Sequence, residues 1–341
     1  MKFTTPLLAL ALAGSPALVA QDIPAPDGKP ADMSKPVQVF LVMGQSNTLE
    51  FGKVSDELKT KYPFLVTDGA WNTRQDVRNV SVMQKRGNMG VYRNEWLTVE
   101  GKNKIGIEVG IGHQLGNAID APVMVLKSSI GNRSLGWDLL PPGTPRYTAE
   151  GKECPGYGET HPLLPSTGKG KPKPDTTKIV PYKEGETLGW YAGKQYDDDV
   201  GNAKKILAEL NKYYPEAKSY EVAGIIWWQG DKDMRNPAHA AMYEKNLGFL
   251  LAALRKDFNA PNAKFVCASL GQTDEGDTDS GHGKILHAMK NFAASSGDID
   301  FVYSKPLLGA PSSSSAHYSG NAETYMNVGL ALGAKMAELV K

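Results

Sequence analysis

The chain has 341 residues, a length that allows one large α/β domain or two smaller domains. Hydrophobic residues make up 41% and charged residues 22%, values typical of globular proteins, so a wholly disordered chain is excluded. Lysine and arginine total 38 against 37 aspartate and glutamate residues. This balance leaves no basic surplus for binding a phosphate backbone, and we expect no nucleic-acid partner.

The N-terminus has the pattern of a secretory signal peptide. Lys2 supplies a short positive region, and the apolar run 6–13 is too short to span a bilayer of ~30 Å. Small residues follow, so we expect residues 1–20 to be removed and the mature protein to be secreted or periplasmic. No later stretch approaches ~18 consecutive apolar residues, and no membrane span is expected. Residues 21–36 are rich in Pro, Asp and Lys and predict a flexible leader.

Five apolar runs predict strands that are buried on both faces of a parallel sheet, because they are continuous rather than alternating. These runs are 37–43, 121–129, 222–228, 264–270 and, more weakly, 298–304. Helical patterns precede the last four strands and close the chain, at 107–119, 196–213, 237–258, 283–294 and 322–340. The alternation predicts an α/β fold with helices on both faces of the sheet, in one domain over 37–341.

Residues 140–190 interrupt this alternation. The stretch is dense in Gly, Pro and Lys and follows the second predicted strand. A structureless loop of this length is either a functional lid or a solvent-exposed insertion. Its position after the crevice end of that strand favours a loop that roofs the site.

The chain has two cysteines, Cys154 and Cys267. They could pair outside the cytoplasm, although two separate thiols are the favoured interpretation. Their spacing does not suit zinc, and the acidic cluster 274–279 lacks the ordered spacing of a calcium loop. We therefore expect no metal and no cofactor.

Ser46 is a candidate nucleophile. It follows the first predicted strand, where its hydroxyl would lie at the crevice edge of the sheet, although a helix N-cap is the favoured role on position alone. A serine nucleophile needs a nearby base. Of six histidines, His317 is the best candidate, because it lies in a polar loop before the last helix and could face the same crevice.

Acyl transfer also needs hydrogen-bond donors for the developing oxyanion. Gly131 and Gly230 follow the second and third strands, where backbone N–H groups could approach a ligand, and Gln229 adds a side-chain amide. Each glycine alone is more often a simple turn residue. Together, three strand ends would place these groups and Ser46 in one crevice.

Five segments support a more specific interpretation: FLVMGQSN at 40–47, IGIEVGIGHQL at 105–115, VLKSSIGNRSLGWDLLPP at 125–142, IIWWQGDKD at 225–233 and HYSGNAETYMNVG at 317–329. In this order they resemble the blocks of the SGNH hydrolases, in the form of the sialate O-acetylesterase-like carbohydrate esterases. The resemblance covers nearly all of 37–341. It implies a three-layer, flavodoxin-like fold and a serine esterase that needs no metal.

The same resemblance implies roles for particular residues. Ser46 would be the nucleophile and His317 the base. The oxyanion donors would be the backbone N–H groups of Ser46 and Gly131 and the side-chain amide of Gln229.

The triad acid is where the sequence departs from the family pattern. Many SGNH enzymes carry it three residues before the histidine, but that position is Ser314 here. We favour Asp231, because an acidic residue after the Gln-Gly pair takes this role in some members. Asp233 could be the acid instead or cap the following helix, and a dyad is a further alternative. Glu108 is expected to be a buried structural carboxylate at a helix start. On this interpretation Asp231→Asn lowers the rate far more than Asp233→Asn, and Ser314→Ala matters least.

The implied activity is removal of O-acetyl groups from an acetylated oligo- or polysaccharide through an acyl-enzyme. The alternative is a non-catalytic carbohydrate-binding domain on the same scaffold, with Ser314 as the trace of lost activity. In either case Trp137 and Trp190 could stack on sugar rings. Trp227 and Trp228 could do the same or pack in the core, because they end a buried strand.

Overall fold

A seven-stranded sheet, in the order β15-β14-β13-β1-β8-β5-β6, forms the centre of the molecule. The computed structural model describes residues 23–85, 88–165, 171–310 and 315–341, so the predicted signal peptide lies outside the described residues. The strands are β1 (Val37–Gly44), β5 (Thr73–Lys85), β6 (Asn88–Thr98), β8 (Val123–Ser129), β13 (Tyr220–Trp228), β14 (Lys264–Ala268) and β15 (Ile299–Val302). All neighbours pair in parallel except β5 and β6, which form an antiparallel hairpin at one edge.

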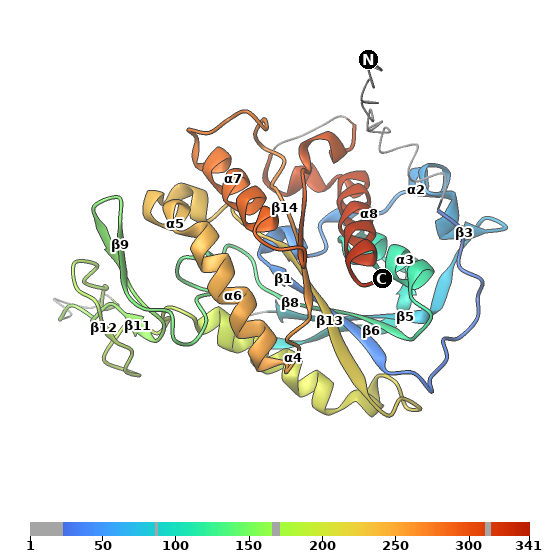
Figure 1. Ribbon diagram of the computed structural model, residues 1–341, viewed down its shortest axis with the longest axis horizontal. Coiled ribbons are helices and arrows are strands. Elements are labelled where there is room, and N and C mark those ends of the chain that lie inside the picture. The colour runs from blue at the N-terminus through green and yellow to red at the C-terminus, as the bar shows by residue number, and fades with distance from the viewer. Residues whose placement is uncertain (1–22, 86–87, 166–170, 311–314) are drawn as a thin grey trace, which may run out of the picture.

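Helices cover both faces of this sheet (Figure 1). One face carries α3 (Glu108–Ala118) and α8 (Ala322–Leu339), and the other carries α4 (Lys194–Ala208), α6 (Tyr243–Asp257) and α7 (Gly281–Ala294). Side chains of β1 alternate between the two layers: Leu41 and Met43 pack with α4, α6 and α7, whereas Phe40 and Val42 pack with α3 and α8. Because both faces are buried, the sequence of this strand is a nearly continuous apolar run. The predicted three-layer α/β fold is confirmed.

Shorter elements surround this core. They are β2 (Gly52–Lys53), α2 (Glu57–Lys61), β3 (Val66–Thr67), β4 (Ala70–Trp71), β7 (Lys104–Ile105) and α5 (Pro237–Ala241), with 3₁₀ turns at Ser46–Thr48, Pro63–Leu65, Leu210–Lys212, Asp233–Arg235, Lys305–Leu307 and Ala316–Gly320. The predicted helix 237–258 is thus two helices, because the backbone of Met242 (φ −100°, ψ 2°) leaves the helical conformation between α5 and α6.

The sequence pattern missed β5 and β6. In β5 the buried polar residues Asn79 and Ser81 alternate with Val80 and Val82, so no continuous apolar run is present. β6 is the edge strand of the sheet, and Val91 is among its exposed side chains. Both strands therefore lack the pattern that marked the other five.

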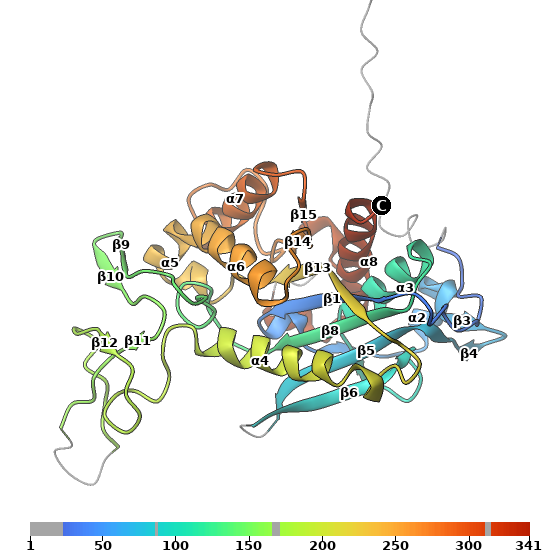
Figure 2. The same ribbon diagram turned by 60° about the horizontal axis from the view of Figure 1, so that its bottom comes forward.

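The insertion at 140–190 contains two small hairpins rather than one structureless loop: β9 (Tyr147–Ala149) with β10 (Lys152–Cys154), and β11 (Glu159–Thr160) with β12 (Val180–Pro181). They project as a lobe beyond α4 and α5 (Figure 2). Two backbone hydrogen bonds close the neck of this lobe, from Gly193 N to the Trp137 carbonyl at 2.8 Å and from Gln195 N to the Asp138 carbonyl at 2.9 Å. That the lobe roofs the site stays a prediction.

The two cysteines are both buried and unpaired, Cys154 in β10 and Cys267 in β14. The favoured interpretation of two separate thiols is therefore confirmed. The lack of pairing follows from their positions, because one lies in the lobe and the other inside the central sheet.

Residues 23–36 contain no helix or strand, and they lie against the end of α3. The Lys35 ammonium donates to the Asp120 carbonyl at 2.8 Å, and the Asn117 amide donates to the Pro24 carbonyl at 3.2 Å. The flexibility expected of this leader stays a prediction. Within the described part of the chain, no helix combines the length and the apolar character needed to cross a membrane.

Candidate active site

Ser46 lies directly after β1, in the 3₁₀ turn Ser46–Thr48. The strand can enter this turn because residue 44 is glycine: its φ is +150°, and a Cβ atom there would lie 2.4 Å from the carbonyl oxygen of Trp228. Gln45, not Ser46, occupies the N-cap position, and no side chain caps the turn. The predicted capping role of Ser46 is therefore wrong. Its hydroxyl has no hydrogen bond with another described residue, which leaves it available for chemistry.

Gly131 lies beside Ser46, just past the end of β8. A Cβ atom at residue 131 would be 3.5 Å from the Cβ atom of Ser46. The two segments meet because β1 and β8 are parallel neighbours, so their carboxyl ends open onto the same edge of the sheet. The structure thus brings together the two residues whose backbone N–H groups were expected to bind the oxyanion.

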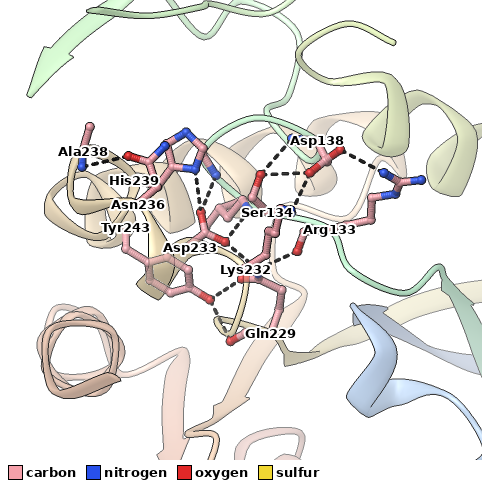
Figure 3. A network of polar contacts seen from close by, with 12 residues as sticks. Arg133, Ser134, Asp138, Gln229, Lys232, Asp233, Asn236, Ala238, His239 and Tyr243 are labelled. Atoms are coloured by element: carbon pink, nitrogen blue, oxygen red, sulfur yellow. Dashed lines mark hydrogen bonds and ion pairs between the residues drawn. The ribbon is translucent and has the colours of Figure 1, made fainter. Parts of the chain in front are cut away.

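Gln229 is fully buried at the end of β13, and its amide connects several segments. Its Nε2 donates to Asp233 Oδ2 at 2.5 Å and to the Arg133 carbonyl at 2.8 Å, and Gln45 Oε1 is a third acceptor at 3.2 Å. Its Oε1 accepts from the Tyr243 hydroxyl at 2.7 Å (Figure 3). An amide has two hydrogens, and both are engaged here. An oxyanion role for Gln229 requires one of them to be released, and that role stays a prediction.

His317 lies in the turn before α8, and this turn has a left-handed backbone. Three successive non-glycine residues have positive φ: His317 at 54°, Tyr318 at 51° and Ser319 at 55°. Each such residue costs about 1–2 kcal/mol, so the surroundings must hold the turn in place. Tyr318 supplies that hold: its buried ring stacks on Trp228 with centroids 5.5 Å apart, and its hydroxyl donates to the Leu270 carbonyl at 2.5 Å.

Two contacts connect the His317 turn with the segment that begins at Ser46. The Asn47 amide donates to the Tyr318 hydroxyl oxygen at 3.3 Å. The imidazole of His317 stacks on Phe51, with ring centroids 3.9 Å apart and planes within 2° of parallel. Among the described residues no hydrogen bond joins the His317 ring to Ser46. Catalytic hydrogen bonds often form only when substrate is bound, so this geometry is compatible with a nucleophile and base pair.

Asp231 is partly exposed and forms an ion pair with Arg235 at 2.7 Å. Partial burial lowers the pKa of His317 below its ordinary value of 6.5, and the negative charge of Asp231 opposes that shift. Asp231 is therefore within electrostatic reach of the imidazole, although no hydrogen bond joins the two described side chains. Its role as the triad acid stays a prediction. Ser314, the position where the family pattern fails, lies outside the described residues.

Asp233 is fully buried, and its carboxylate points into the protein. Oδ2 accepts from Leu135 N at 2.8 Å, and Oδ1 accepts from Gly136 N at 2.7 Å. Burial raises the pKa of Asp233 to about 7, against the lowering effect of its N–H donors. It does not cap the next helix, because the Asn236 side chain takes that position by accepting from Ala238 N at 3.2 Å. The predicted capping role of Asp233 is therefore wrong.

Trp137 and Trp190 lie where the insertion joins the body. The Trp137 ring lies 5.1 Å from the ring of His161, and the guanidinium of Arg133 lies 3.9 Å from the ring centroid of Trp190. Arg133 belongs to the loop after β8, so Trp190 forms part of the wall beside that loop. Sugar stacking by these two residues stays a prediction.

Trp227 and Trp228 are fully buried in the core. The indole of Trp227 donates to the Tyr243 hydroxyl at 3.0 Å, and that of Trp228 donates to the Ser269 carbonyl at 2.9 Å. Buried indoles need such partners, and core packing is the confirmed interpretation.

Below the crevice, Glu108 is buried at the start of α3, as expected. It forms an ion pair with the equally buried Lys127 at 2.8 Å and accepts from Gly106 N at 2.8 Å. Burial favours a higher pKa, but the charge and hydrogen bond of Lys127 outweigh it, and the pKa of Glu108 is lowered. The pair is a structural one that joins β8 to α3.

The described residues contain no group of three or more His, Cys, Asp or Glu side chains that could hold a metal ion. In the acidic cluster 274–279, the Asp277 carboxylate accepts from the hydroxyls of Thr273 and Ser280 before α7. Asp274 and Glu275 instead form ion pairs with lysines, namely Lys305 and Lys290.

Sequence reasoning missed three supporting residues. The inward orientation of Asp233, the stack of Phe51 on His317 and the anchoring role of Tyr318 all depend on tertiary contacts. Only Tyr318 had a local signal, because a large aromatic residue beside a candidate base in a polar loop needs somewhere to be buried.

Comparison with known proteins agrees with this architecture. The family model for carbohydrate esterases described as sialic acid-specific acetylesterases matches residues 170–338. No curated protein sequence matches the chain. Among solved structures, a protein from Arabidopsis thaliana has a TM-score of 0.50 at 14% identity, covering 89% of this chain and 99% of that one.

Two further structures are more distant. A carbohydrate acetylesterase from Xanthomonas citri gives a TM-score of 0.48 at 14% identity, covering 87% of this chain and 55% of that one. NanS gives 0.44 at 13% identity, covering 81% and 78%. The family match contains Gln229, Asp231 and His317, and it coincides with two of the five blocks found in the sequence. Over residues 170–338 the chain is thus similar to the carbohydrate esterases described as sialic acid-specific acetylesterases.

Proposed function

We propose that the protein is a serine esterase that removes O-acetyl groups from carbohydrates outside the cytoplasm. The observation that carries this proposal is the meeting of Ser46 with Gly131 at the carboxyl edge of the sheet, with the His317 turn tied to the same segment. The match of residues 170–338 to the carbohydrate esterase family model supports an acetylated sugar as the substrate. The signal-peptide pattern of residues 1–20 supports export.

In the first half-reaction, Ser46 Oγ attacks the carbonyl carbon of the acetyl ester while His317 accepts the hydroxyl proton. The carbonyl oxygen becomes an oxyanion, which the backbone N–H groups of Ser46 and Gly131 stabilise. The intermediate then expels the sugar oxygen, and His317 returns the proton to it. In the second half-reaction, His317 deprotonates water, which attacks the acetyl-serine. The tetrahedral intermediate expels Ser46 Oγ, which takes the proton back from His317, and the acetic acid released ionises to acetate.

The electrostatics of His317 suit this role. Because burial lowers its pKa, the imidazole is neutral at neutral pH and can accept a proton. The nearby charge of Asp231 favours the imidazolium that forms during attack. In the structure the ring stacks on Phe51, so we expect it to turn toward Ser46 when substrate binds.

The test is hydrolysis of p-nitrophenyl acetate and of an O-acetylated sugar by the purified protein and by Ser46→Ala. Losing the nucleophile should lower kcat/KM by roughly 10⁴–10⁶-fold with the fold unchanged. Ser295→Ala, at the end of α7, is the matched control and should keep the wild-type rate.

Two outcomes count against the proposal. If Ser46→Ala keeps more than a few per cent of the activity, Ser46 is not the nucleophile. If the wild-type protein binds acetylated sugar but releases no acetate, the chain is a binding domain on an esterase scaffold.

A further inference from the structure

We infer that Asp233 is a positioning residue: its buried carboxylate fixes the loop that carries the Gly131 N–H and thereby sets the rate of acyl transfer. The inference rests on the proposed function, because it assigns Asp233 to the oxyanion side of that reaction. It separates Asp233 from the role of triad acid.

The loop after β8 is held by two residues of the segment 225–233, Gln229 and Asp233. Asp233 accepts from the backbone N–H groups of Leu135 and Gly136, at 2.8 and 2.7 Å. Gln229 donates to the Arg133 carbonyl at 2.8 Å and to Asp233 itself at 2.5 Å (Figure 3). Three successive parts of the loop are therefore tied to one buried pair.

Among the residues that the structure describes, no lysine or arginine forms an ion pair with Asp233. The nearest candidate is His239, whose Nδ1 lies 3.7 Å from Oδ1. Burial lowers the pKa of His239 to about 4, so the ring is neutral at neutral pH. Asp138, which accepts from Ser134 N at 2.7 Å in the same loop, adds a repulsive negative charge. A buried carboxylate without a cation is unfavourable unless N–H donors surround it, and here those donors belong to the loop and to Gln229.

The same loop is also confined by His239. A Cβ atom at Gly136 would lie 2.5 Å from Cγ of His239, so the loop backbone lies directly against the imidazole ring. Gly136 thus lies against the His239 ring while its N–H is held by the Asp233 carboxylate. Gly131 is five residues upstream in this loop, next to Ser46.

This arrangement predicts a particular kinetic defect. The oxyanion is absent from the ground-state complex and develops in the transition state that leads to the tetrahedral intermediate, so a displaced N–H donor lowers kcat while leaving KM nearly unchanged. Loss of one oxyanion donor costs about 10²–10³-fold in kcat. Asp233→Asn places an NH₂ group against N–H donors, and we expect kcat to fall about 10²-fold.

Asp199→Asn is the matched control. Asp199 is also fully buried, its pKa is also raised to about 7 by burial, and its carboxylate accepts from Gln195 Nε2 at 2.6 Å and Ser128 Oγ at 3.3 Å. It makes no hydrogen bond to the loop 131–136. A merely structural effect of neutralising a buried carboxylate should therefore be similar in both variants.

The experiment measures kcat and KM with p-nitrophenyl acetate, together with amide hydrogen exchange of the loop 131–136 by mass spectrometry. In Asp233→Asn we expect the fall in kcat, a KM within threefold of wild type, and faster exchange in the loop. In Asp199→Asn both kcat and loop exchange should stay near wild type. Wild-type kcat in Asp233→Asn, or an equal fall in Asp199→Asn, overturns the inference.

The exchange measurement keeps the two proposals distinguishable. If the wild-type protein has no esterase activity, the proposed function fails, and loop exchange still shows whether Asp233 holds the loop. Unchanged exchange in Asp233→Asn overturns the positioning role whatever the activity. Should Asp233→Asn fail to fold, Asp233→Glu keeps the charge but displaces the acceptor atoms, and it should lower kcat at least threefold; wild-type kcat in that variant also overturns the inference.

Discussion

The two sides of the crevice are held by different kinds of contact. On the Gly131 side, the loop backbone donates hydrogen bonds to the buried Asp233 carboxylate and accepts one from the Gln229 amide. On the His317 side, a left-handed turn is held by aromatic stacking, and the imidazole rests on Phe51. The difference matches the chemistry, since oxyanion donors work best when fixed, whereas a base must exchange its proton with two partners in turn. The comparison teaches that the Gly131 loop is held through its backbone, whereas on the His317 side the backbone is held by Tyr318 and only the imidazole has to move.

His317→Ala is the variant with the largest expected effect, and it tests the His317 side of the crevice. Without a base, Ser46 cannot be activated, and we expect kcat/KM to fall roughly 10⁴-fold or more. Added imidazole should restore part of the rate, because the vacated space adjoins the crevice. The measurement is ester hydrolysis with and without imidazole. A variant that keeps a tenth of the activity would mean that another group is the base.

Gly136→Ala tests the Gly131 side of the crevice. The new methyl group meets the His239 ring at 2.5 Å, so the loop must shift. We expect a destabilisation of about 1–3 kcal/mol and a fall in kcat of about 10²-fold from the displaced N–H donor. Thermal unfolding and ester hydrolysis measure the two effects. Gly248→Ala in α6, where nothing lies within 4 Å of the added Cβ, is the control: it should leave kcat unchanged and, if anything, stabilise the protein by about 0.5–1 kcal/mol.

Asp231→Asn tests the electrostatics of the His317 side. Its charge raises the pKa of His317, so removing it should move the acid limb of the kcat/KM profile to lower pH. A single charge acting through space, without a hydrogen bond, should change the rate by about tenfold. Asp233, with a pKa raised to about 7, adds its own titration to the profiles of both proteins, so it cancels in their comparison. An acid limb that moves upward would contradict the assignment.

This expectation reverses the order inferred from the sequence, in which Asp231 matters far more than Asp233. The physical reason is the burial of Asp233 and its three N–H donors, compared with the partly exposed ion pair of Asp231. A fall of several orders of magnitude in Asp231→Asn alone would restore the original order. It would also show that Asp231 bonds directly to His317 in the substrate complex.

Phe51→Leu has the smallest expected effect. The stack on His317 is worth about 0.5–1.5 kcal/mol, and the ring must leave it for catalysis, so kcat should change by less than about threefold. Steady-state kinetics measures this, with Phe64→Leu, a buried ring that packs against His113 away from the site, as the control. A loss above 10²-fold would show that the stacked position of His317 is the active one.

The sequence predicted the parts of this structure that depend on local pattern. Continuous apolar runs identified five strands, and the positions of Ser46, Gly131 and His317 just past strands or before the last helix placed them at one edge. β5 was not predicted, because its residues Asn79 and Ser81 alternate with valines, a pattern that polar loops share. β6 was not predicted either, because it is an edge strand without a continuous apolar run. The inward orientation of the Asp233 side chain could not be predicted, because the local sequence Asp-Lys-Asp at 231–233 gives no signal that distinguishes the two aspartates.

The closed neck of the lobe has a consequence for how the sequence of this region can vary. Because the chain leaves at Trp137 and returns at Gly193, joined by a hydrogen bond of 2.8 Å, the lobe is a module with adjoining ends. Doubling the length of such a loop costs only about 0.6 kcal/mol in closure entropy. The lobe can therefore be shortened, extended or exchanged between proteins while the strands below it, which carry Ser46 and Gln229, stay in register.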